Sequence, residues 1–119
     1  MIRNEEAEME MRIIASEVYP HLKGDKPMPK IESKQGGASG AYYRNEHTVR
    51  IRWNVWNKLS WAGKRMLMIH ELYHAKGNHH KGSDLFLHAF DILTIELYKK
   101  IYGEDKEYQK LLNKIKDLV

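Results

Sequence analysis

The sequence has 119 residues, with 20 basic and 16 acidic side chains and no cysteine. Without cysteine there are no disulfides, thiolate metal sites or cysteine nucleophiles, so any metal ligands must be histidine or carboxylate. An apolar fraction of 42% is sufficient for a packed core, and no apolar run approaches the roughly 18 residues of a membrane span. The N-terminus is acidic where a signal peptide is basic and then apolar. We therefore expect one globular domain over residues 1–119, cytoplasmic and not membrane-associated.

The N-terminal third predicts one helix followed by a loop. Residues 5–19 have an amphipathic pattern, and Asn4 is a suitable N-cap. Residues 20–40 contain all three prolines and the run GGASG, which favour a loop. The apolar stripe expected on the helix consists of Met9, Ile13, Ile14 and Val18.

Apolar and polar residues alternate with a period of two in residues 41–56. This pattern indicates a β-hairpin that leads into a half-buried strand. It consists of the segment AYYR, the dipeptide Asn45-Glu46 and the segment HTVRIRWNVW. Part of 28–34 is a candidate third strand. The face expected to be buried comprises Val49, Ile51, Trp53 and Val55.

Three helices are expected in the C-terminal half. Ser60 can cap a helix that runs to about residue 76, and its apolar positions recur at helical spacing. A second helix is expected from about 84 to 102, ended by Gly103, and a third from 105 to 118. The fold class predicted is α+β, with an N-terminal helix, a small sheet, a central helix and two C-terminal helices.

The central helix carries the motif that points to chemistry, His70-Glu71-Leu72-Tyr73-His74. Residues i and i+4 of a helix lie on one face, one turn apart, so two imidazoles at this spacing can bind one zinc ion. The intervening glutamate can then reach a water on the metal rather than the metal itself. His70 and His74 are therefore candidate zinc ligands, and Glu71 is the candidate general base.

The residues that follow extend this motif. Gly77 is placed to end the helix, and His80 comes six residues after His74. Five of the seven histidines fall within residues 70–88. The full string H-E-x-x-H-x-x-G-x-x-H has the geometry of a three-histidine site, which makes His80 the preferred third ligand.

Residues 70–80 resemble the zinc signature of the metzincin metallopeptidases, although all six methionines precede His70 and the downstream methionine turn of that group is missing. The spacing is similar to that of small intracellular zincin-like families, the WLM and SprT-like peptidases, and the size is similar to that of minimal gluzincins. This resemblance implies a zincin-like fold and zinc-dependent hydrolysis of a peptide or protein substrate. In such an enzyme Glu71 activates the zinc-bound water.

Several alternatives stay open. In gluzincins the third ligand is a glutamate on the next helix, which makes Glu96 an alternative to His80, and Asp84 is another. A metal-dependent endoribonuclease family has the same His-x3-His-x5-His spacing, and the mildly basic composition gives weak support to nucleic-acid binding. A latent or non-catalytic zincin scaffold is the third class, with the last helix or the N-terminal segment covering the site or with self-association through it.

Overall fold

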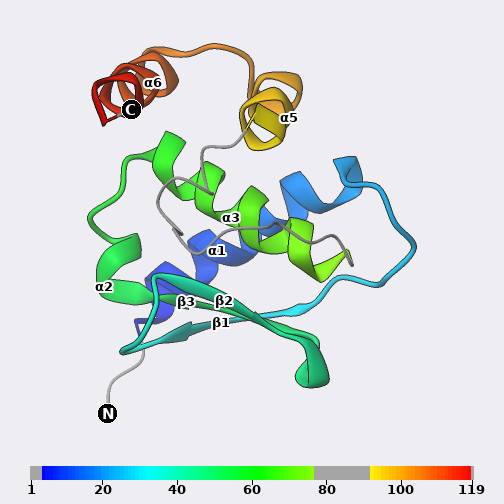
Figure 1. Cartoon of the computed structure of the whole chain (residues 1–119). Helices are drawn as coiled ribbons and strands as arrows, with labels where there is room; N and C mark the ends of the chain where they lie inside the picture. Colours follow the sequence, from blue (N-terminus) through cyan, green and yellow to red (C-terminus); the bar gives the residue numbers. More distant parts are fainter. Residues whose placement is uncertain (1–3, 77–91, 119) are drawn as a thin grey trace.

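The computed structural model describes residues 4–76 and 92–118 of the chain. Its class is α+β, as predicted, with a small mixed sheet and several helices. Figure 1 shows helices α1 and α3 on one side of the sheet, and α5 and α6 beyond α3. The elements are α1 (Glu5–Val18), η1 (Tyr19–His21), β1 (Lys30–Lys34), β2 (Gly40–Tyr43), η2 (Arg44–Glu46), β3 (Thr48–Arg52), α2 (Trp53–Trp56), α3 (Trp61–Ala75), α5 (Ile92–Tyr102) and α6 (Lys106–Leu118).

Helix α1 begins where the sequence predicts, and it buries half of the expected stripe, Ile14 and Val18. The side chain of Asn4 accepts a hydrogen bond from the backbone N–H of Ala7 at 3.0 Å, which confirms the cap. Met9 and Ile13, expected in the core, are 61% and 56% exposed. Ala7, Met11 and Ala15 are buried in their place. The buried apolar face consists of Ala7, Met11, Ile14, Ala15 and Val18.

The sheet has three strands in the order β1-β3-β2. Strand β3 is central, with β1 parallel to it and β2 antiparallel to it. The strand suggested within 28–34 is therefore confirmed as β1. Val49 and Ile51 of β3 are buried against the helices, as their alternation predicts.

The predicted strand ends earlier than expected. Residues 53–56 form the short helix α2, so the expectation that Trp53 and Val55 continue the strand is wrong. The helical turn brings Trp56 into the core, where its indole Nε1–H donates to Glu10 of α1 at 3.0 Å. This tertiary contact overrides the local alternation.

The central helix agrees closely with its prediction. The hydroxyl oxygen of Ser60 accepts from the N–H of Gly63 at 3.1 Å, which makes it the N-cap of α3. Helix α5 ends before Gly103, whose φ of 78° is in the left-handed region. The start expected for that helix, at about residue 84, lies outside the described residues. None of the helices in the described ranges has the length and apolar character needed to cross a bilayer.

Candidate functional site

Helix α3 holds the His70-Glu71-x-x-His74 motif inside the molecule rather than on its surface. One side of the helix packs against α1 and the sheet, and the other packs against α5 and α6 (Figure 1). A helix covered on two sides needs few exposed positions. As a result His70 and Glu71 are buried, and His74 is half-buried.

The two histidines lie next to each other on α3. Their ring centres are 4.9 Å apart, and the ring planes are perpendicular. Two imidazoles that share one tetrahedral zinc, with Zn–N bonds of about 2.0–2.1 Å, have ring centres roughly 5 Å apart. The separation of His70 and His74 therefore suits a shared metal ion.

Glu71 is positioned beside this pair. Its Oε1 lies 3.6 Å from Nε2 of His70, which is close but longer than a hydrogen bond. Only 2% of the residue is exposed. Burial raises the pKa of Glu71 to about 7, and the positive charge of Lys34 acts in the opposite direction. A carboxyl group with a pKa near neutrality is suited to exchange a proton during a reaction.

The edge strand β2 crosses directly over Glu71. A Cβ atom added at Gly40, the first residue of β2, would lie 3.1 Å from Cγ and 3.2 Å from Cδ of Glu71. These distances are tighter than almost all real contacts of a Cβ atom. Glycine therefore permits the backbone of β2 to approach the candidate base.

The backbone of β2 also presents polar groups to the edge. The N–H of Arg52 donates to the carbonyl of Ser39 at 2.8 Å, which makes these two residues a hydrogen-bonded pair. Antiparallel pairing alternates, so Ala41 pairs with β3 while the N–H and C=O groups of Gly40 and Tyr42 point outward. An extended peptide that paired with these groups would pass over Glu71.

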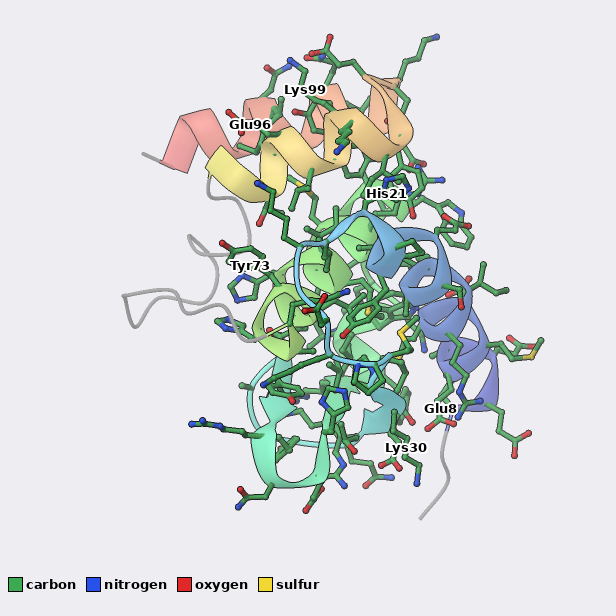
Figure 2. The ribbon with its side chains drawn as sticks, turned by 90° about the vertical axis from the view of Figure 1, so that its right-hand side faces the viewer. Glu8, His21, Lys30, Tyr73, Glu96 and Lys99 are labelled. Carbon is green, nitrogen blue, oxygen red and sulfur yellow. The ribbon has the colours of Figure 1, made fainter. Side chains whose placement is uncertain are left out.

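The opposite edge of the sheet is closed by α1. Glu8 accepts from the N–H of Ser33 at 2.8 Å and from its hydroxyl at 3.0 Å. Arg12 donates to the carbonyl of Ile31 at 3.4 Å. Figure 2 shows Glu8 of α1 and Lys30 of β1 in the lower right of the view. The outer backbone of β1 is therefore occupied by side chains of α1, whereas no strand among residues 4–76 and 92–118 pairs with the outer edge of β2.

Of the candidates for the third ligand, only Glu96 lies among the described residues. His80 and Asp84 lie outside the described residues. Glu96 is exposed on α5, with Lys99 one turn further along, and Figure 2 shows it at the top of the view, well above Tyr73 of α3. Within residues 4–76 and 92–118, no three His, Asp or Glu side chains gather as a metal site. The structure thus brings His70, Glu71 and His74 together, and it does not bring Glu96 to them.

The last helix is anchored at the other end of α3. Glu107 of α6 accepts from the N–H of Ala62 at 3.3 Å, and Asp105 contacts Arg65 at 3.4 Å. Ala62 is about 18 Å along the helix from His74, at a rise of about 1.5 Å per residue. These contacts hold α6 at the start of α3, so they give no support to the idea that this helix covers the histidines.

Sequence reasoning missed two residues near the motif, Gly40 and Lys34. Both lie within residues 20–40, which read as a loop apart from the candidate strand in 28–34, and their proximity to Glu71 depends on how the sheet packs on α3. A glycine inside a strand can mark close backbone approach, but the predicted strand began at residue 41, after Gly40.

We predict that Gly40→Ala lowers the turnover of any reaction that uses Glu71. The added methyl group would displace the carboxyl group by a few tenths of an ångström, and we expect about a tenfold loss of kcat. Gly36→Ala is the matched control, because a Cβ atom there meets nothing within 4 Å. Steady-state kinetics and melting temperatures of both variants make the test, and equal turnover of the two would refute this role of Gly40.

Comparisons with protein-family models, curated proteins and solved structures gave no match.

Proposed function

We propose that this protein is a zinc-dependent metallopeptidase with a zincin-like arrangement of a backing helix, a small sheet and an active-site helix. The observation that carries the proposal is that Glu71 and His74 each lie beside His70 on α3, with Glu71 against the edge strand β2. The resemblance of residues 70–80 to the zinc signature of peptidases supports the same assignment.

The residues present fit a zinc ion. Two neutral imidazoles are preferred zinc ligands, and the ring separation of 4.9 Å suits a shared ion. Two protein ligands are fewer than the three of a typical catalytic site. His70 and His74 would hold the metal together with His80, which stays the preferred third ligand on its spacing. Glu96 is a poorer choice because it is exposed and lies away from α3.

A zinc ion bound there would supply a Lewis acid that polarises the scissile carbonyl and acidifies a water molecule. Glu71 would accept the proton of the attacking water on a carboxylate oxygen and then transfer it to the leaving amine. Its burial excludes bulk water from the carboxyl group and keeps its pKa close to neutral. Gly40 would hold this carboxyl group in place through direct contact.

The substrate would bind in an extended conformation. The outward backbone groups of Gly40 and Tyr42 offer main-chain pairing, and Glu8 and Arg12 occupy the competing edge at β1. A peptide added to β2 brings its own backbone, which contains the scissile bond, above Glu71. Main-chain pairing favours unfolded or flexible protein segments as substrates.

The test is to incubate the zinc-loaded protein separately with denatured casein and with structured RNA. We expect new peptide termini by mass spectrometry, loss of cleavage after removal of zinc with a chelator, recovery when zinc is returned, and intact RNA. Cleavage of RNA with intact casein would replace the proposal with the endoribonuclease alternative. A zinc-loaded protein that cleaves neither substrate would favour the non-catalytic scaffold.

A further inference from the structure

His47, in the turn between β2 and β3, has a backbone conformation that residues other than glycine rarely adopt. Its φ is 46° and its ψ is 54°, which is the left-handed region. Among the described residues it is the only one other than glycine with a positive φ. A residue persists in such a conformation where its surroundings hold it there, and such residues gather at functional sites. The contacts of His47 therefore have to offset an unfavourable backbone.

Both ring nitrogens of His47 are hydrogen-bonded. Nε2 lies 2.7 Å from the carbonyl oxygen of Pro27, and Nδ1 lies 2.6 Å from the hydroxyl oxygen of Tyr42. A carbonyl oxygen can only accept a hydrogen bond, so Nε2 carries the proton of the neutral imidazole. Nδ1 then accepts from the hydroxyl of Tyr42. In this tautomer the ring bridges β2 and the segment that precedes β1.

Tyr42 joins this bridge to the edge of the sheet. Its side chain is half-buried against the core, while its backbone N–H and C=O point outward from β2. It lies two residues from Gly40, and therefore on the same face of the sheet, where Gly40 meets Glu71. A shift of the Tyr42 side chain would thus move the backbone groups that are proposed to pair with a peptide.

The carbonyl that receives His47 is tied to the end of α3. The carbonyl oxygen of Pro27 also accepts from the hydroxyl of Tyr19 at 2.8 Å. The ammonium of Lys76 lies 4.1 Å from the centre of the Tyr19 ring, and it donates to the carbonyl of Gly24 at 2.9 Å. Lys76 directly follows the last residue of α3. The segment from Gly24 to Pro27 therefore connects this end of the helix to His47 and, through His47, to β2.

We infer that His47 is a positioning residue of the peptide-binding edge. It holds Tyr42, and with it the outward backbone groups of β2, in a fixed place relative to α3. Strand β2 has four residues and pairs with β3 on one side only, so the bridge adds a restraint that its own pairing lacks. An edge that is already held in place has less to order when a peptide binds, and binding is tighter. This inference rests on the proposed function for its choice of a peptide as the ligand.

Binding and cleavage of denatured casein test this role. Fluorescence anisotropy of rhodamine-labelled denatured casein gives the Kd on the full-length, zinc-loaded Glu71→Gln protein, and cleavage by the protein with Glu71 intact gives KM and kcat. In His47→Asn the new side chain tolerates the left-handed conformation but is too short to bridge both partners. Tyr42→Phe lacks only the hydroxyl. Tyr102→Phe is the matched control, because it removes a hydrogen bond to Glu17 between α5 and α1.

We expect His47→Asn to raise both the Kd and the KM for casein about tenfold, with kcat and zinc content unchanged. A loss of binding that is equal in the ground state and the transition state has this signature. Tyr42→Phe should weaken binding in the same direction. The double variant should bind no more weakly than His47→Asn alone, since both substitutions remove the same bridge. Tyr102→Phe should bind casein like the protein without this substitution.

An unchanged Kd in both His47→Asn and Tyr42→Phe, or a lower kcat at an unchanged KM, would overturn this role. An equal loss of binding in Tyr102→Phe would also overturn it, because loosening of the whole fold would then explain the effect. Casein that does not bind the Glu71→Gln protein at all would overturn it too. Failure of the proposed function looks different, because casein would stay uncut while its binding still depended on His47.

Discussion

The Glu71→Gln protein should bind zinc like the wild type and cleave casein about 10²–10⁴-fold more slowly. Glutamine has nearly the same shape as glutamate, so the contact with Gly40 is retained. It cannot accept a proton from the attacking water, and this removes the base while leaving the imidazoles of His70 and His74 untouched.

Zinc content, melting temperature and casein cleavage of this variant should be measured together. Glu6→Gln serves as the control, because Glu6 is an exposed carboxylate on α1, and it should behave like the wild type. Undiminished cleavage by Glu71→Gln would show that Glu71 is not the base. Loss of zinc together with activity would instead indicate that Glu71 is a ligand.

The second large effect is expected from His74→Ala. This side chain is half-buried, whereas His70 is in the core, so truncation at His74 disturbs packing less. Loss of one imidazole should abolish stoichiometric zinc binding and reduce cleavage to the level of the chelated wild type. Zinc should stabilise the folded wild type by about 4 kcal/mol at a free zinc concentration of 1,000 times the Kd. His74→Ala should lack this stabilisation.

Thermal melting with and without zinc measures this linkage. The wild type should gain several degrees from zinc and His74→Ala should gain none, while the exposed control His21→Ala should respond like the wild type. The same titration on His80→Ala and Glu96→Ala separates the two third ligands, and we expect the zinc response to be lost only in His80→Ala. A zinc response retained in His74→Ala would rule out the proposed ligand pair.

Local signals were sufficient to predict helix α3. The Ser60 cap and the helical spacing of Ala62, Met66 and Ile69 describe α3 well. The motif on it is also local, because residues four apart on a helix are neighbours whatever the rest of the fold does. His70 and His74 could therefore be paired from the sequence alone.

Features that depend on packing between distant segments could not be predicted. Helix α1 buries Ala7 and Ala15 rather than Met9 and Ile13 once it packs on its neighbours. The helical turn α2 places Trp56 within hydrogen-bond reach of Glu10. The contact of Gly40 with Glu71 arises only when the sheet packs on α3. Sequence periodicity carries no information on such contacts.

The most direct test of the metal centre is a crystal structure of the full-length protein grown with zinc, with diffraction data collected above and below the zinc absorption edge. We predict one anomalous peak about 2.1 Å from an imidazole nitrogen of each of His70, His74 and His80, with Glu71 outside bonding distance. A zinc peak elsewhere, or no peak between His70 and His74, would contradict the account.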